Sequence, residues 1–348
     1  MNKAVIIDQT RPDRDSALEL LRIFAMLGIL SFHFAVNSGF DFPVEAMTLN
    51  KLWHRLIWVG GYLGDNIFVM LSGYFLVKSS SASFKKFFNL WVKMFFYSLS
   101  GFLILIFAGV ESFSLRALFN VVRPITANHW WFATIYFMLY LLHPYLNIFL
   151  NKMTREEYQK FLVTAVICWS IIPTVLKTDL AGSGLMNFIC LYSIAGYVRL
   201  WADDFGSKKY ILYGCLFIAI NFLSAVVIDL FSINMQIFRH HTFHLYKMMM
   251  PFTILAALCF LIGFKHLRIQ YKFINLAASA IFGVYLIHDY VFLRKFLWRN
   301  ILQGVEFQDS PYLIPYSIFA VLLVYIFCTL IELTRSKIFR IISGGRLS

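Results

Sequence analysis

Charged residues are scarce in this sequence. Only 14% of its 348 residues are Asp, Glu, Lys or Arg, whereas 60% are hydrophobic. Soluble globular proteins carry about 25% charged residues, so this balance excludes a disordered chain and a soluble two-domain enzyme. Cysteine is also sparse, and its five residues lie in apolar segments with no Cys-x-x-Cys spacing. A disulfide scaffold and a cysteine metal site are therefore excluded as well.

Hydrophobic residues are numerous enough for about ten membrane crossings, because one crossing needs about 20 apolar residues. We therefore predict an all-α polytopic membrane protein with about ten transmembrane helices. The intervening loops are short and leave no separate soluble domain. The apolar runs place the spans near residues 17–36, 57–77, 90–110, 130–150, 161–176, 186–201, 211–230, 248–264, 275–293 and 312–333.

The distribution of Lys and Arg predicts how these spans are oriented. With both termini in the cytoplasm, 19 of the 31 basic residues fall in cytoplasmic segments, 10 in outer segments and 2 within spans. Basic residues concentrate on the cytoplasmic side of membrane proteins. We expect one transmembrane domain, 1–348, with cytoplasmic tails at 1–15 and 334–348. The net charge of +13 then requires no nucleic-acid partner.

Ionisable residues inside a span are costly and are functional candidates by default. Arg22 and His33 lie eleven residues apart in the first span, which is 20° from three full helical turns, so both project from one face. Their axial separation is about 16 Å. Glu19 lies on nearly the same face and can orient the guanidinium. Arginine binds phosphate in a bidentate manner, and histidine exchanges protons near neutral pH, so this face could bind an anion and transfer protons. The alternative is purely structural: the Arg22 side chain reaches the membrane interface, and His33 packs beside a loop.

Other polar residues are less specific. Asp65 follows three glycines and either faces the bundle interior as an acceptor or clamps the first two spans together. Trp130 is expected in the interfacial aromatic belt. Asp229 and Glu332 lie near span ends, where we expect them to reach water.

Three histidines, His240, His241 and His244, gather in one outer loop. They have no acid or cysteine nearby in the sequence, so we interpret them as solvated side chains and predict no metal site.

Several segments together resemble a known family. They are Glu19-Leu20-Leu21-Arg22 leading to His33, Gly64–Tyr74 ending in Ser-Gly-Tyr, Trp130–Phe132 with Tyr140–Pro144, and Tyr285-Leu286-Ile287-His288. In this order and on these sides of the membrane they are similar to acyltransferase family 3. Members are integral-membrane, acyl-CoA-dependent O-acyltransferases of envelope glycans, and their membrane domain suits ten helices.

The resemblance implies a set of site residues. It implies that Arg22 and His33 are required for activity, and we add Asp65 as a residue that could orient the imidazole. The family often has two arginines three residues apart at the start of the third span. This sequence departs from that pattern, because Ser83–Lys93 has no arginine and no basic pair at that spacing; Lys86 or Lys93 could take their place. The further residues that we expect to bind substrate are Glu19, Lys86, Lys93, His129, Trp131, Tyr136 and His288.

The resemblance also implies the partners. The expected donor is acetyl-CoA, with no permanently bound cofactor, and the acceptor is a surface polysaccharide or a lipid-linked sugar. The expected location is a bacterial cytoplasmic membrane, in contact with its lipids. His33 could act as a general base or carry the acyl group transiently, and the sequence leaves both open.

Two other classes of protein remain as alternatives. A transporter or flippase of a glycan or organic anion also needs many helices and an intramembrane arginine. Against it, the two halves show no repeat and no matched pair of helices broken by Gly or Pro. A non-catalytic scaffold would tolerate substitution of Arg22 and His33.

Overall fold

The computed structural model describes residues 15–178, 184–202, 206–235, 238 and 241–342. Within these ranges every regular element is a helix. Together with their apolar composition, this confirms an all-α polytopic membrane protein. The longer helices are α1 (Ser16–Asn37), α2 (Leu49–Trp58), α3 (Gly60–Leu76), α4 (Phe84–Phe107), α6 (Trp131–Lys152), α7 (Arg155–Val166), α9 (Gly184–Trp201), α10 (Tyr210–Asn234), α11 (Pro251–Phe264) and α14 (Leu313–Ile342).

The short elements connect or extend these helices. A π-helical turn, Ile167–Ile171, joins α7 to α8 (Ile172–Leu176), and α12 and α13 meet at Ala280. Side chains cap several starts; for example, the Asp15 carboxylate accepts hydrogen bonds from the first backbone amides of α1, which satisfies donors that the helix itself cannot. The remaining elements are α5 (Leu115–Val121), α12 (Lys272–Ser279), α13 (Ile281–His288), a second π-helical turn at Phe296–Ile301, and 3₁₀ turns at His244–Tyr246 and Gly304–Phe307.

Eight helical segments of the described chain are long and apolar enough to cross a membrane. Each coincides with one of the predicted spans. The other two predicted spans, 186–201 and 275–293, correspond to α9 and to the broken pair α12–α13. The count of ten crossings and the cytoplasmic location of the termini remain predictions. The predicted N-terminal tail lies almost entirely outside the described residues, whereas most of the predicted C-terminal tail is helical, because α14 continues past residue 333 to Ile342.

The second predicted span is longer than expected, because α2 and α3 together run from Leu49 to Leu76. Polar residues of α2 interrupt the apolar run in the sequence, but the fold pairs them. Asp229 of α10 accepts hydrogen bonds from Arg55 Nε and from Thr242 Oγ1, each at 2.8 Å. Asp229 is 5% exposed, so the expectation that it reaches water was wrong.

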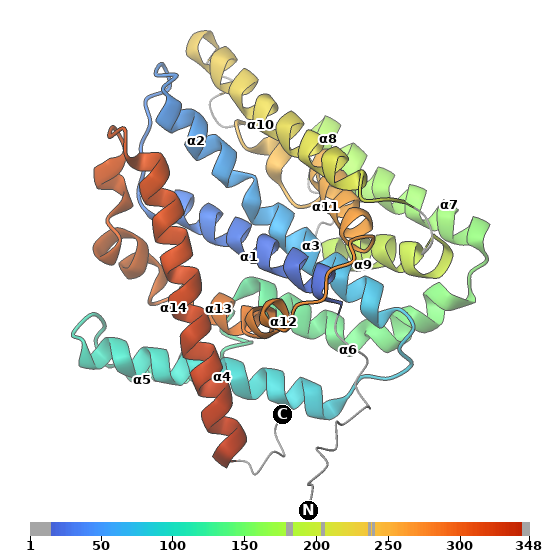
Figure 1. Ribbon diagram of the computed structural model, residues 1–348, viewed down its shortest axis with the longest axis horizontal. Coiled ribbons are helices and arrows are strands. Elements are labelled where there is room, and N and C mark those ends of the chain that lie inside the picture. Colours follow the sequence, from blue (N-terminus) through green and yellow to red (C-terminus); the bar gives the residue numbers. More distant parts are fainter. Residues whose placement is uncertain (1–14, 179–183, 203–205, 236–237, 239–240, 343–348) are drawn as a thin grey trace, which may run out of the picture.

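The centre of the molecule is the pair α1 and α3, which pack against each other more extensively than most helix pairs in the protein. Figure 1 shows them side by side, with α14 on one flank and α9 and α11 on the other. Their backbones nearly touch where Gly28 meets Gly60: a Cβ added to Gly60 would lie 2.4 Å from the Gly28 carbonyl oxygen. Small residues allow membrane helices to approach this closely.

We expect Gly60→Ala to destabilise the protein. The added methyl group would meet backbone atoms of α1, which cannot rotate away, and overpacking of this kind costs about 1–3 kcal/mol. The measurement is the thermal unfolding midpoint of the detergent-solubilised protein. Ser31→Ala, which removes an atom from α1 instead, is the control, and an unchanged midpoint for Gly60→Ala would contradict the close contact.

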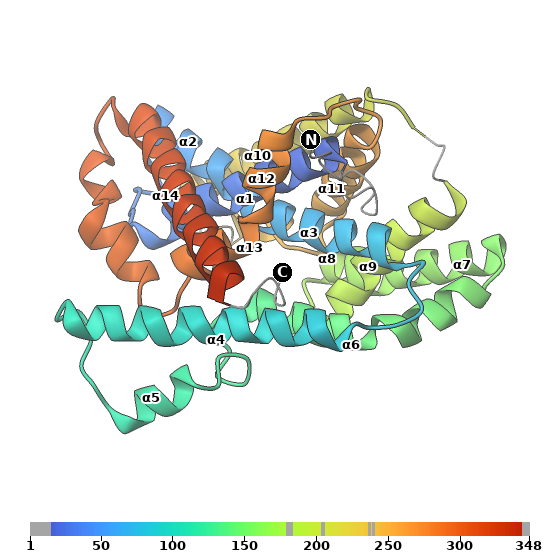
Figure 2. The ribbon, with the colours of Figure 1, turned by 60° about the horizontal axis from the view of Figure 1, so that its bottom comes forward.

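Helix α14 crosses α4 at the edge of the molecule (Figure 2). At this crossing Glu332 accepts hydrogen bonds from Lys93 Nζ at 2.8 Å and from the Tyr97 hydroxyl at 2.6 Å. Arg335 binds the same carboxylate through two nitrogens, each at 2.8 Å. Glu332 is therefore buried, and the expectation that it reaches water was also wrong. The cluster fixes α4 against α14 and leaves one net positive charge.

Candidate active site

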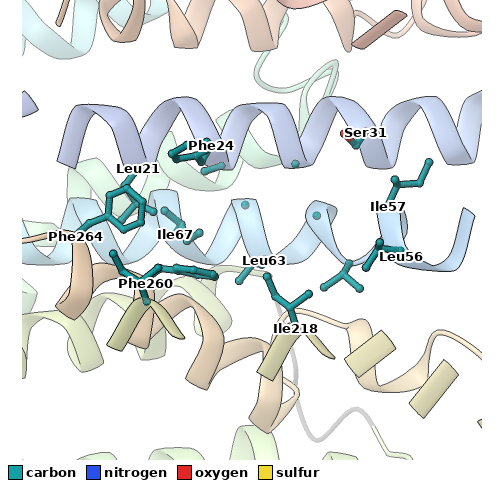
Figure 3. A pocket seen from close by; sticks show the side chains of 16 residues that line it. Leu21, Phe24, Ser31, Leu56, Ile57, Leu63, Ile67, Ile218, Phe260 and Phe264 are labelled. Carbon is teal, nitrogen blue, oxygen red and sulfur yellow. The ribbon is translucent and has the colours of Figure 1, made fainter. Parts of the chain in front are cut away.

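Two faces of α1 border two different cavities. One face carries Leu21, Phe24 and Gly28 and borders an apolar groove of about 410 Å³ that α3, α10 and α11 complete. Figure 3 shows this groove, whose labelled side chains are apolar apart from Ser31. The Ser31 hydroxyl donates to the Leu27 carbonyl oxygen. This face therefore offers no group for acid–base or nucleophilic chemistry.

The opposite face of α1 carries Arg22, Met26 and Ile29 and borders a second cavity of about 420 Å³, here named the central pocket. These residues follow the stripe that was predicted to run from Arg22 to His33. Helices α3, α4, α6, α12 and α13 supply the other walls. Five predicted site residues line the pocket, namely Arg22, Asp65, Lys86, Lys93 and Tyr136.

Positive charge gathers at the Arg22 end of the central pocket. Arg22 Nη1 donates to Glu19 Oε1 at 2.7 Å, and the guanidinium lies over the Phe75 ring at 5.4 Å. Glu19 does not line the pocket, and its carboxylate orients the Arg22 guanidinium, as the spacing predicted. Lys86 is exposed, whereas Lys93 is held by Glu332. Arg22 and Lys86 are therefore the cations best placed to meet an incoming anion.

His33 lies one helical turn beyond Ile29, which lines the central pocket. Its Nδ1 is 2.9 Å from His288 Nε2, and the side chain is 12% exposed. His288 is completely buried at the end of α13, and its Nδ1 lies 2.7 Å from the Val284 carbonyl oxygen. The fold therefore joins two histidines that are 255 residues apart in the sequence.

The hydrogen bonds of this pair define the tautomers of the neutral rings. A carbonyl oxygen can only accept, so His288 Nδ1 carries the proton that is donated to Val284. His288 Nε2 is then an acceptor, and it takes the hydrogen bond that His33 Nδ1–H donates. His33 Nε2 is left with a free lone pair. The arrangement thus presents one imidazole nitrogen as a base or a nucleophile.

A carboxylate stands beside that nitrogen. Asp289 Oδ1 is 3.8 Å from His33 Nε2 and 3.2 Å from Arg294 Nη1. A carboxylate at this distance stabilises the imidazolium that forms when His33 takes a proton. Asp289 and Arg294 were not among the predicted site residues. The signal that could have found them is an acid directly after His288 with an arginine five positions later.

The remaining predicted residues are placed as follows. Asp65 lines the central pocket, but among the hydrogen bonds of the described residues none joins it to His33. Trp131 lines a different pocket at the start of α6. The Trp130 side chain is fully buried and its Nε1 donates to the Leu286 carbonyl oxygen, so its assignment to the interfacial belt was wrong.

His129 is packed inside the protein and does not line any cavity described above. It is 5% exposed, and its Nδ1 lies 3.0 Å from Ser98 Oγ. Burial lowers the pKa of His129 to about 4, because the surroundings disfavour the charged ring. His129 is therefore neutral at pH 7 and holds the loop before α6 against α4.

Comparison with known proteins identifies the family of the chain. The model of a family described as an acyltransferase domain matches residues 15–331, nearly the whole chain. The chain belongs to acyltransferase family 3. No curated protein and no solved structure matches it.

Membership of this family indicates the class of reaction. The protein is a multi-pass membrane acyltransferase. A base or nucleophile next to a cavity with a cationic end is chemically suited to acyl transfer.

Proposed function

We propose that the protein is an O-acetyltransferase of a bacterial cytoplasmic membrane that moves an acetyl group from cytoplasmic acetyl-CoA to a hydroxyl of an envelope glycan. The observation that carries the proposal is the His33–His288 pair, with His33 Nε2 left free, one helical turn from a pocket whose other end carries Arg22 and Lys86. The charge suits an anionic donor, and the free nitrogen suits transfer to a hydroxyl.

Arg22 and Lys86 would bind phosphate groups of the donor. Arg22 already has its guanidinium oriented by Glu19 at 2.7 Å, which reduces the ordering cost of binding. The axial distance of about 16 Å between Arg22 and His33 leaves room for the pantetheine arm between its phosphates and its thioester. Asp65, Tyr136 and Tyr285 line the pocket along this path.

In the proposed reaction His33 Nε2 takes the proton of the sugar hydroxyl while the hydroxyl oxygen forms a bond to the thioester carbonyl carbon. The carbon–sulfur bond then breaks, and the CoA sulfur receives the proton from the His33 imidazolium. Asp289 stabilises this imidazolium, and His288 keeps the ring in the required tautomer. The other route, in which His33 Nε2 first accepts the acetyl group, uses the same free nitrogen.

The test is transfer of radiolabelled acetyl from acetyl-CoA to total envelope glycan of the source cells by purified protein in lipid nanodiscs. We expect label that mild alkali releases from the glycan, as it does from an ester. No labelled glycan would overturn the function, and glycan translocation in proteoliposomes without label would favour a transporter. The acyl-histidine route is tested by a reaction without acceptor that is stopped without acid. Label that remains on the wild-type protein and is absent from His33→Gln would identify this route.

We expect Arg22→Lys to raise the KM for acetyl-CoA about tenfold while it lowers kcat much less. Lysine keeps the charge but loses the bidentate fork, so donor binding weakens more than the chemical step. Steady-state kinetics with acetyl-CoA as the varied substrate measure both constants. Arg116→Lys, at an exposed arginine of α5 that does not line the pocket, is the control. An unchanged KM for Arg22→Lys would remove Arg22 as a phosphate ligand.

A further inference from the structure

Two more pockets adjoin each other near the N-terminal ends of α3 and α6. The first, here named the aromatic pocket, has a volume of about 490 Å³ and is lined by Tyr62, Trp131, Trp169, Asn187 and Lys247, among others. The second, here named the basic pocket, has a volume of about 540 Å³. Both pockets share Pro173, Lys247 and Met250 as wall residues. Together they form one continuous groove.

The aromatic pocket and the central pocket are lined by neighbouring residues of the same two helices. On α3, Tyr62 lines the aromatic pocket and Asp65, three residues later, lines the central pocket. On α6 the corresponding neighbours are Trp131 and Phe132. The Phe32 ring lies 6.2 Å from the Tyr62 ring and 5.5 Å from the His33 ring. Phe32 therefore lies between the Tyr62 wall of the aromatic pocket and His33.

The chemistry of the aromatic pocket suits a sugar ring. Tyr62, Trp131 and Trp169 are half-buried and offer apolar ring faces with polar tips, on which the C–H face of a pyranose can pack. Asn187 and Lys247 add hydrogen-bonding groups for hydroxyls. A few polar groups within a largely apolar wall are typical of small-molecule sites.

The basic pocket adds positive charge. Its described lining contains Arg55, Lys177, His241, His244 and Lys247 and no Asp or Glu. The charge of Arg55 is compensated by Asp229 at 2.8 Å, and His244 Nε2–H donates to the Thr174 carbonyl oxygen at 3.3 Å. Lys177 and Lys247, both exposed, are therefore the cations that a bound anion would meet. His240 of the same loop lies outside the described residues.

Several contacts hold the loop that carries this pocket in place. The Phe243 ring stacks on Trp58 with centroids 3.8 Å apart, and the Arg55 guanidinium lies 4.9 Å from the same ring. Thr242 is tied to Asp229, and His244 is tied to α8 through Thr174. The basic pocket is therefore built into the fold, and its histidines serve as wall residues.

From this arrangement we infer that the groove binds the acceptor and that the acceptor is an anionic glycan, with a sugar ring in the aromatic pocket and a phosphate or carboxylate group between Lys177 and Lys247. The inference rests on the proposed function and specifies its acceptor. The distribution of basic residues assigns the loops of this groove to the outer side of the membrane, where envelope glycans are completed.

The experiment divides total envelope glycan from the source cells into neutral and anionic fractions by anion exchange before the labelled transfer reaction. We expect label in the anionic fraction only. Label in the neutral fraction alone, or equally in both, overturns the inference but leaves the proposed function intact, whereas label in neither overturns the function. Phosphate removal with hydrofluoric acid and carbodiimide reduction of carboxylates, each before transfer, then identify the group that is recognised.

The double variant Lys177→Gln with Lys247→Gln tests the site itself. We expect it to raise the KM for the anionic fraction at least about tenfold and to leave the KM for acetyl-CoA unchanged. In the wild type, 0.5 M salt should produce a similar rise because it screens exposed charges. Lys295→Gln, another exposed lysine of a predicted outer loop, is the matched control. An unchanged KM in the double variant overturns the site.

Discussion

His33→Ala should abolish acyl transfer, with a fall in kcat of about a thousandfold or more. The substitution removes the only nitrogen of the His33–His288 pair that is free to take a proton, and general-base catalysis contributes about 10²–10⁴-fold. His33→Gln should be equally inactive, because its amide can still donate a hydrogen bond to His288 but cannot act as a base. Both are measured by labelled acetyl transfer in nanodiscs.

The control for the loss of activity is Ser31→Ala. Ser31 lies two residues before His33, on the face of α1 that lines the apolar groove. It should retain full activity. Size-exclusion chromatography and the thermal unfolding midpoint establish that both His33 variants are folded. Substantial activity in a folded His33→Gln protein would show that another group performs the chemistry.

His288→Ala should lower kcat about a hundredfold and leave the KM for acetyl-CoA within about twofold. Without His288 Nε2, the His33 ring loses the acceptor that holds its Nδ1–H at 2.9 Å, and a misplaced catalytic group costs about this much. His288 does not line the central pocket, so donor binding should not change. We therefore propose that His288 is a positioning residue that acts through His33.

His288→Gln separates positioning from a general structural effect. The amide oxygen of glutamine can accept the hydrogen bond from His33 Nδ1, so this variant should recover to within about tenfold of the wild-type kcat. His129→Gln, at another buried histidine that lies outside the site, is the matched control. Equal losses in His288→Ala and His288→Gln, or a large rise in the donor KM, would contradict the positioning role.

Much of the fold could be predicted from the sequence, because spans are set by the length and polarity of local segments. The prediction failed where a distant residue neutralises a local charge. Arg55 interrupts the apolar run before α3, yet Asp229 of α10 pairs with it, so α2 and α3 form one long segment. Glu332 is buried for the same reason, since Lys93 and Arg335 surround it.

The candidate site was also predicted only in part from the sequence. Helical periodicity placed Glu19 next to Arg22, and the ion pair confirms this. It also predicted that Arg22 and His33 share a face; Arg22, Met26 and Ile29 line the central pocket on that face, whereas His33 is not among the lining residues. Periodicity cannot show what lies opposite that face. The partner of His33 comes from α13, 255 residues further on, and the sequence offered the nearer Asp65 as the orienting residue instead.

The contact between Gly28 and Gly60 has a consequence for how substrates enter. Since two backbones meet there without intervening side chains, α1 and α3 form a closely packed wall between the apolar groove and the central pocket. Neither helix can swing aside without separating from its partner. Under the proposed function, we therefore expect donor entry and CoA release to use the other walls of the central pocket, which are α4, α6, α12 and α13. Spin labels placed on α4 and α12 should report such an opening.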